Sequence, residues 1–316
     1  MKTILVTGGA GFIGSHLVER LLALGHTVVA LDNFDPFYDE AIKRANIQGV
    51  LDHPRFSFVQ GDLLDRPSLD QRLRSQPTDL VIHLAAKAGV RPSLEDPAGY
   101  FRANVTGTIN LLDAMKAAGV RQMMFASSSS VYGNNKKLPF AETDNVDYPI
   151  SPYAASKKSG ELICHTYHTL YNMDIFAYRF FTVYGPRQRP EMAIATFARR
   201  ILDGKPITLF DGNGSTSRDY TFIDDIIDGL VGSLDRLKGY EVFNLGESQV
   251  VKLLDLVKLL ETHLHKKAEI RFEGRQPGDV DATYADISKA RKMLGYNPLT
   301  KIDAGVRRYC EWVLGG

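Results

Sequence analysis

The segment TILVTGGAGFIGSHLVERLLALGHTVVALDN, residues 3–33, constrains the fold more than any other part of the chain. Residues 3–6 are a short β-branched apolar run, which is typical of a strand covered on both faces. Apolar residues then recur near helical spacing until Gly25 ends the helix, and the TVVAL run begins a second strand. The segment therefore predicts a strand–turn–helix–strand unit.

The turn of this unit has the glycine spacing G-x-x-G-x-x-G, at Gly8, Gly11 and Gly14. The first glycine permits a tight turn, the second lets the backbone approach a pyrophosphate, and the third allows close contact between helix and strand. Asp32 ends the second strand roughly 20 residues further on, where a carboxylate accepts from the adenosine ribose and repels a 2′-phosphate. Three glycines can be purely structural, but this context predicts bound NAD rather than NADP.

Strands and helices continue to alternate along the first half of the chain. Apolar runs typical of buried strands occur at 56–63, 79–86, 121–129 and 174–181. Asp96 and Pro97 begin one of the intervening helices as cap and first helical residue, with Phe101 and Met115 on its apolar stripe. This alternation predicts an α/β fold with a doubly wound parallel sheet of the Rossmann type.

The pattern changes to shorter elements at about residue 183. A helix predicted at 251–264 carries a leucine-rich stripe typical of core, and the VFNLG run at 242–246 is expected to return to the sheet as a late strand. We therefore predict an NAD-binding domain at 1–182 and a smaller mixed α/β substrate domain at 183–316, interleaved by that strand.

Composition excludes several classes of partner. The 38 Lys and Arg against 37 Asp and Glu provide no basic field for nucleic acid or anionic lipid. Cys164 and Cys310 lie far apart, without metal-ligand spacing, as is typical of a reduced compartment. The start MKTILVTGG has no signal-peptide pattern, and no apolar run approaches a membrane span. We predict a soluble cytoplasmic protein that binds no metal, nucleic acid or membrane.

The stretch ASSSSVYG, residues 126–133, places four hydroxyls where a buried strand ends. In a parallel sheet the strand ends meet at the edge that binds ligands. We therefore expect these serines to face one crevice, together with Asp62, Leu84 and Ala85 at other strand ends, rather than to form a surface turn. Capping of the strand end remains an alternative for Ser127.

A helix in SPYAASKKSGE begins with Ser151 as cap and Pro152 as first residue, so Tyr153 and Lys157 share one face. A nearby ammonium lowers the pKa of a tyrosine, which allows a phenolate to act as general base near neutral pH. This pairing also occurs in ordinary helices. The upstream glycine turn and serine-bearing strand end favour the catalytic interpretation.

The chain resembles the extended short-chain dehydrogenase/reductase family of nucleotide-sugar epimerases and dehydratases over essentially its whole length. Five motifs carry the resemblance: TGGAGFIGSHL, HLAA, SSSSVYG, YAASK and RDYTFIDD. The resemblance implies a catalytic triad of Ser128, Tyr153 and Lys157. Tyrosine removes a proton from a sugar hydroxyl, serine shortens that hydrogen bond, and lysine holds the nicotinamide ribose. The NAD site expected from the glycine turn, the strand ends and the resemblance comprises Gly8, Gly11, Phe12, Ile13, Gly14, Asp32, Asn33, Asp62, Leu63, Leu84, Ala85, Ala86, Asn104, Tyr153, Lys157 and Phe180.

Ser129 and Ser130 distinguish between reactions within this family. The resemblance implies Asp and Glu at these two positions in 4,6-dehydratases, and Glu at the second in decarboxylases. Serine is neither a strong acid nor a strong base at pH 7. We therefore predict a redox-neutral epimerase that oxidises the sugar, turns the ketone over and reduces it from the other face, with tightly bound NAD regenerated in each cycle.

The stretches DNFDPFYDEAIKRANI, AAKAGVRPSLEDP and FFTVYGPRQRPEMA resemble UDP-glucuronate 4-epimerases and related uronate enzymes most. Ser129, Ser130 and Thr182 are expected to donate hydrogen bonds to the C6 carboxylate and hold it in the plane of the ring, which suppresses loss of carbon dioxide from the β-keto acid. The alternatives are a UDP-glucose or UDP-N-acetylhexosamine 4-epimerase, then a UDP-glucuronate decarboxylase or dehydratase, and a catalytically silent NAD sensor.

Further substrate contacts are expected from the loops. Arg91 and Arg189 are candidates for the carboxylate, although each could instead form a salt bridge. The resemblance implies that Arg218 and Arg275 hold the diphosphate, a task that suits planar guanidinium groups, and Phe210 is a candidate uracil contact. A homodimer through helices near 97–118 and 153–171 is also expected, although core burial explains the same apolar stripes.

Overall fold

The computed structural model describes residues 1–315, which form two compact units. Unit 1 comprises Met1–Gly133, Asn145–Arg179 and Leu230–Phe243. Unit 2 comprises Asn134–Asp144, Phe180–Gly229 and the residues from Asn244 onward. The chain therefore passes between the units several times.

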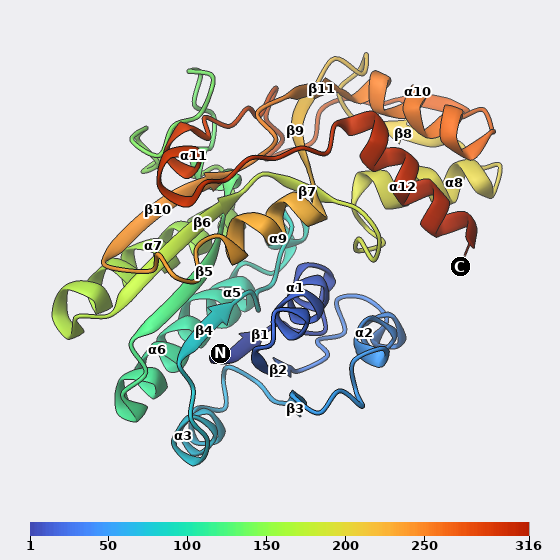
Figure 1. The fold of residues 1–316 in the computed structure, drawn as a ribbon. Coiled ribbons are helices and arrows are strands. Elements are labelled where there is room, and N and C mark those ends of the chain that lie inside the picture. The colour runs from blue at the N-terminus through green and yellow to red at the C-terminus, as the bar shows by residue number, and fades with distance from the viewer. Residues whose placement is uncertain (316) are drawn as a thin grey trace. The chain divides into compact units, whose positions relative to one another are not determined.

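A seven-stranded sheet forms the centre of unit 1 (Figure 1), with the order β10-β6-β5-β4-β1-β2-β3. Its strands are β1 (Thr3–Thr7), β2 (Thr27–Asp32), β3 (Phe56–Gln60), β4 (Leu80–His83), β5 (Gln122–Ser128), β6 (Asp174–Phe180) and β10 (Tyr240–Leu245). The pairs β1–β2, β1–β4, β2–β3 and β4–β5 are parallel. The predicted doubly wound fold is confirmed, and the strand order reverses between β1 and β4, where such sheets bind ligands.

Helices connect these strands and cover the sheet. They are α1 (Phe12–Ala23), α2 (Glu40–Gln48), α3 (Arg66–Ser75), α4 (Val90–Glu95), α5 (Pro97–Phe101), η1 (Arg102–Thr106), α6 (Gly107–Ala118), η2 (Ser129–Tyr132) and α7 (Pro152–Tyr171). Leucines of α3 and α6 and Cys164 of α7 pack with apolar residues of β1, β2, β4, β5 and β6 in one core. This core holds the strand ends in place on that side of the sheet.

The helix predicted to begin at Asp96 and Pro97 does so, and the Asp96 side chain accepts a hydrogen bond from Gly99 N–H. The predicted apolar stripe is wrong at Phe101, whose side chain is 39% exposed, whereas Met115 is fully buried. A π-helical turn, η1, lies between them. Because such a turn inserts an extra residue, it shifts the buried face out of the regular helical period.

Unit 2 is built from short elements, as the sequence predicted for this part of the chain. They are β7 (Thr182–Tyr184), α8 (Ala193–Leu202), β8 (Ile207–Leu209), β9 (Ser217–Phe222), α9 (Ile223–Val231), β11 (Val250–Lys252), α10 (Leu253–Leu264), β12 (Ile270–Phe272), α11 (Ser288–Leu294) and α12 (Ile302–Gly315). One sheet has the order β11-β9-β7, and β12 pairs with β8. The leucine-rich face of α10 is buried, as predicted for core.

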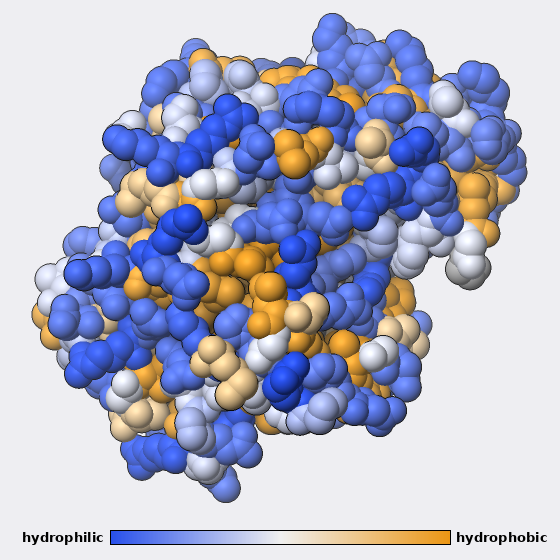
Figure 2. Space-filling model, in the orientation of Figure 1, coloured by the Kyte–Doolittle hydropathy of each residue, from blue (hydrophilic) through white to orange (hydrophobic). Residues whose placement is uncertain are grey.

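Hydrophilic residues cover most of the face drawn in Figure 2, and hydrophobic residues lie between them in smaller groups. None of the helices formed by residues 1–315 is both long enough and apolar enough to cross a bilayer.

Candidate active site

The glycine turn after β1 is closed by contacts that only glycine permits. Gly8 has a φ of 71°, and its N–H donates to the Leu31 carbonyl at 2.7 Å. A Cβ atom added to Gly14 would lie 2.1 Å from the Gly8 carbonyl oxygen. Gly11 caps α1 without a side-chain hydrogen bond, so Phe12 and Ile13 open the helix with backbone N–H groups for an anion.

The ends of β2 and β3 bring together the predicted adenosine-side residues. Asp32 is 7% exposed, and its carboxylate accepts from Ala10 N–H at 3.2 Å and from Phe34 N–H at 2.9 Å. Burial raises the pKa of Asp32 above its ordinary value, although these donors oppose the shift. The Asn33 amide donates to the Asp62 carboxylate at 3.1 Å, and the Leu63 carbonyl accepts from the Asn110 amide at 2.9 Å.

Buried His83, at the end of β4, links Thr7 of β1 to Thr108 of α6 by hydrogen bonds. The Thr108 hydroxyl donates to the Asn104 carbonyl at 2.6 Å, so at 3.0 Å it accepts from His83 Nε2–H. His83 Nδ1 is then the acceptor for the Thr7 hydroxyl at 2.7 Å, and that hydroxyl oxygen accepts from Ala85 N–H at 3.3 Å. This chain of hydrogen bonds places a proton on Nε2 and connects His83 of β4 to β1 and α6.

The segment after β4 returns to the same place. Leu84 N–H donates to the Thr7 carbonyl at 3.1 Å, and a Cβ on Gly8 would lie 2.8 Å from Ala85 N. Ala86 is half-buried beside them in sequence. The structure therefore brings the glycine turn against the HLAA motif, as expected of two segments that share one ligand.

Asn104 lies in the π-turn η1 and is 3% exposed. Its side-chain oxygen accepts from Lys87 N–H at 2.8 Å, and its amide donates to the Lys87 carbonyl and to Ser156 Oγ, each at 2.9 Å. Ser156 in turn donates to the Tyr153 carbonyl at 2.8 Å. Asn104 thereby ties the loop after β4 to the first turn of α7.

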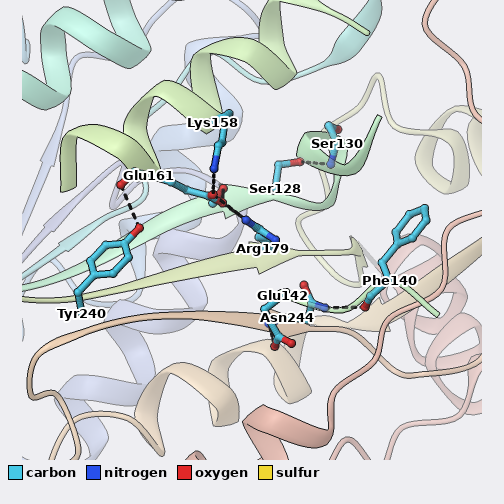
Figure 3. A network of polar contacts seen from close by, with 10 residues as sticks. Ser128, Ser130, Phe140, Glu142, Lys158, Glu161, Arg179, Tyr240 and Asn244 are labelled. Carbon is cyan, nitrogen blue, oxygen red and sulfur yellow. Dashed lines mark hydrogen bonds and ion pairs between the residues drawn. The ribbon is translucent and has the colours of Figure 1, made fainter. Parts of the chain in front are cut away.

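The serine row is a strand end and not a loose surface turn, as predicted. Ser127 and Ser128 are 3% and 7% exposed at the end of β5, and half-buried Ser129 and Ser130 begin the 3-10 helix η2. Ser128 Oγ caps this helix by accepting from Ser130 N–H at 3.1 Å (Figure 3). Ser127 Oγ instead donates to Glu161 at 2.6 Å, so it serves the strand end, the alternative that the sequence left open for this residue.

Tyr153 and Lys157 lie one turn apart on α7, whose N-cap Ser151 accepts from Ala154 N–H. Lys157 is 5% exposed, and its Nζ donates to the Ala126 carbonyl at 2.7 Å. The Tyr153 ring meets the Tyr100 ring edge-on, with 6.2 Å between ring centroids. The helix therefore holds the lysine against β5, two residues before Ser128.

In unit 2, two predicted diphosphate residues meet around one aspartate. Arg218, on β9, donates to the Asp281 carbonyl at 3.4 Å, and Arg275 pairs with the Asp281 carboxylate. Thr182 is half-buried as the first residue of β7, and Phe210 is half-buried after β8. Phe180 is 8% exposed as the last residue of β6.

The two candidate carboxylate arginines lie in different surroundings. Arg189 pairs with Glu191, with 3.2 Å between Nε and Oε1, which is the salt bridge that the sequence left open as an alternative. Arg91 is exposed on α4.

Comparison with known proteins identifies the family to which this chain is related. The family model described as GDP-mannose 4,6 dehydratase matches residues 5–309. The chain belongs to this family. The resemblance to nucleotide-sugar epimerases and dehydratases is thus confirmed.

Individual members of the family are similar over almost the whole chain. UDP-glucuronate 4-epimerase 1 of Arabidopsis thaliana is 45% identical, over 99% of this chain and 76% of its own length. UDP-glucuronate 4-epimerase of Thermodesulfobacterium geofontis is 43% identical, over 99% and 96%. The crystal structure of UDP-glucuronic acid 4-epimerase from Bacillus cereus, in complex with UDP-glucuronic acid and NAD, matches with a TM-score of 0.94 and 38% identity over 99% of both chains.

Two features of this family member were missed from the sequence. His83 lies within the HLAA motif, but its partners Thr7 and Thr108 come from distant parts of the chain. Glu161 pairs with Arg179 beside the end of β5 (Figure 3). A signal for this pair was present, because Glu161 follows Lys157 by one helical turn and Arg179 interrupts an apolar strand, where a buried charge requires a partner.

Proposed function

We propose that the protein is an NAD-dependent UDP-glucuronate 4-epimerase, an isomerase that inverts C4 of a UDP-uronic acid through a transient 4-keto sugar. The observation that carries this proposal is the end of β5, where Ser128, Ser129 and Ser130 lie in sequence and Lys157 is held two residues upstream at Ala126. Hydroxyls at 129 and 130 support turnover and reduction of the ketone rather than elimination of water. The names of the relatives support the same substrate.

The residues of unit 1 fit NAD. The turn at Gly8 and Gly11 leaves the backbone without side chains where α1 presents its first N–H groups, which suits a pyrophosphate. Asp32, the last residue of β2, is assigned to the adenosine ribose, and a carboxylate there favours NAD over NADP. NAD supplies the acceptor and donor of hydride at C4 of the sugar.

The protein's own part in the reaction is proton transfer at the C4 oxygen. Tyr153 takes the proton of the C4 hydroxyl and later returns it, and Ser128 donates a hydrogen bond to the same oxygen. Lys157, held by Ala126, contributes the positive charge that favours the phenolate and holds the nicotinamide ribose. Asn104 positions Tyr153 through Ser156 and the α7 backbone.

Ser129 and Ser130 are assigned to the C6 carboxylate, with Thr182 as a third donor predicted from the sequence. The 4-keto form of a hexuronate is a β-keto acid, which loses carbon dioxide most readily when its carboxylate stands perpendicular to the ring. Hydrogen bonds that hold the carboxylate in plane therefore protect the substrate during epimerisation. Arg218 and Arg275, which share Asp281, are assigned to the diphosphate, and Phe210 to the uracil.

Incubation of the purified protein with UDP-glucuronate and UDP-glucose in separate reactions tests this function. We expect UDP-galacturonate from the first, with no net NADH in solution, and a value of kcat/KM at least about 10-fold lower for the second. Faster formation of UDP-galactose would support the neutral-sugar alternative, and a mainly pentose product would show a decarboxylase.

A homodimer is proposed from apolar residues that α4, α5 and α7 leave exposed. Leu94 and Phe101 are 41% and 39% exposed, and Leu162 and Leu170 of α7 are 56% and 64% exposed. Helical faces of this kind are buried in symmetric dimers. Sedimentation equilibrium is expected to give the mass of two chains.

Buried, unpaired Cys164 and Cys310 support a cytoplasmic location.

A further inference from the structure

A buried ion pair lies beside the end of β5, next to the serine row at residues 127–130. Glu161 of α7 and Arg179 of β6 are 2% and 3% exposed. Arg179 Nε donates to Glu161 Oε1 and Arg179 Nη2 to Oε2, each at 2.8 Å, in a bidentate pair (Figure 3). Burial lowers the pKa of Arg179, but the hydrogen bonds to Glu161 and the charge of that carboxylate outweigh this effect and raise the pKa overall.

The pair contacts the chain on both sides of the serines that we assign to the substrate. Before them, Ser127 Oγ donates to Glu161 Oε1 at 2.6 Å. After them, the ring of Tyr132 in η2 lies against the Arg179 guanidinium, 4.8 Å from its centroid. Ser128, Ser129 and Ser130 are therefore enclosed between two anchored residues.

The anchoring at Ser127 fixes the direction of its neighbour. Successive side chains of a strand point to opposite faces, so holding the Ser127 hydroxyl toward Glu161 directs Ser128 away from it. The preceding residue is also held, because the Ala126 carbonyl accepts from Lys157 Nζ at 2.7 Å. Tyr153, Lys157 and Glu161 follow one another at helical spacing, so a single face of α7 carries the proposed base, its ammonium and this anchor.

We propose that Glu161 and Arg179 are positioning residues, which fix Ser128, Ser129 and Ser130 through Ser127 on one side and Tyr132 on the other. This inference rests on the proposed epimerase function. Its consequence is a specific one: loosening the anchor weakens both proton transfer at C4 and the restraint on the C6 carboxylate.

The second effect provides a readout that lost stability alone does not change. In the 4-keto intermediate, an unrestrained carboxylate leaves as carbon dioxide: the C5–C6 bond breaks, its electron pair passes to C5, next to the ketone, and C5 takes up a proton. The product is a UDP-4-keto-pentose. The ratio of this pentose to UDP-galacturonate is a property of each folded molecule, and it does not depend on how many molecules are folded.

The test compares Ser127→Ala and Arg179→Lys with wild type and with Ser233→Ala. Arg179→Lys keeps the charge but loses the bidentate geometry. Ser233 is a fully buried residue elsewhere in unit 1, so its substitution controls for removal of a buried hydroxyl. We expect kcat to fall about 10-fold or more in both anchor variants, with KM for UDP-glucuronate within about 2-fold and a higher pentose ratio.

Two outcomes overturn the inference. One is an unchanged kcat and pentose ratio in both anchor variants. The other is a fall in activity in the anchor variants that is fully explained by a smaller amount of folded, NAD-containing protein and that is equally large in Ser233→Ala. Wild-type protein assayed in parallel separates these outcomes from failure of the proposed function, since a wild type that leaves UDP-glucuronate unchanged contradicts the function itself.

Discussion

At the scale of single residues, the site depends on buried polar groups whose protonation is fixed by their partners. The pKa of His83 is lowered to about 3, first by burial and second by the charge of Lys157. The hydrogen-bond order from Asn104 through Thr108 to His83 places a proton on Nε2, and the lowered pKa leaves Nδ1 unprotonated near neutral pH. His83 therefore takes no part in acid–base chemistry near neutral pH and serves as a fixed connector between β1 and α6.

This assignment predicts how stability depends on pH. Because the pKa of His83 is lower in the folded protein than its unfolded value of about 6.5, only the unfolded chain binds this proton between about pH 6.5 and pH 3. Above about pH 7.5, His83 should not affect the free energy of unfolding. Between pH 7.5 and pH 5, the titration of His83 should lower the free energy of unfolding by about 2 kcal/mol.

Urea unfolding at both pH values, in wild type and in His83→Gln, measures this contribution. The variant lacks the titrating ring, so its free energy of unfolding should fall by about 2 kcal/mol less than that of wild type over the same interval. Equal pH dependence of the two proteins would show that His83 is already protonated, or readily protonated, in the fold.

Several residue-level predictions followed from spacing alone. Tyr153 and Lys157 share a face because helical periodicity dictates it, and Ser128 lies at a strand end because an apolar run precedes it. The direction of Ser127 toward Glu161 could not be derived in this way. It depends on which neighbouring element lies beneath the strand end, and neither strand nor helix periodicity contains that information.

At the scale of elements, two departures from regular structure shape the cofactor side of the site. The π-turn η1 places Asn104 against Lys87 and Ser156, and it separates exposed Phe101 from buried Met115. Helical periodicity cannot predict such an inserted residue, which is why the stripe expected through Phe101 was wrong. The glycine turn, in contrast, was recognisable because glycine itself is the signal.

The approach of α1 to β1 at Gly14 leads to a mutational prediction. Alanine normally favours a helix by about 1 kcal/mol over glycine. At Gly14, however, the new Cβ would lie 2.1 Å from the Gly8 carbonyl oxygen, so α1 and the turn must separate. We expect Gly14→Ala to lower the melting temperature and to reduce the NAD retained through purification.

Gly49→Ala is the matched control for this substitution. Gly49 follows α2 with a φ of −68°, and no atom lies within 4 Å of an added Cβ. This variant should retain NAD and melt at or slightly above the wild-type temperature. The NAD content of the two variants is measured by absorbance after denaturation. Full retention of NAD in Gly14→Ala would refute the role assigned to the close approach of Gly14 to Gly8.

At the scale of the whole molecule, the chain is divided into two interleaved units that the sequence described only in outline. The alternation of strands and helices predicted the large doubly wound sheet, which is confirmed. The passage of residues 134–144 into unit 2 had no signal in periodicity, because such crossings depend on contacts between distant segments. The late strand expected at 242–246 is β10, Tyr240–Leu245, at the edge of the sheet beside β6.

In the proposed reaction, hydride leaves C4 of the sugar and returns to the opposite face within one turnover. Epimerisation of UDP-glucuronate in D2O tests it most directly, with deuterium at C4 of UDP-galacturonate measured by NMR and mass spectrometry. A hydride held by NAD in the site does not exchange with solvent, so C4 should carry no deuterium. Deuterium at C4 in proportion to turnover would show that the C4 hydrogen exchanges with solvent and would exclude its transfer through NAD.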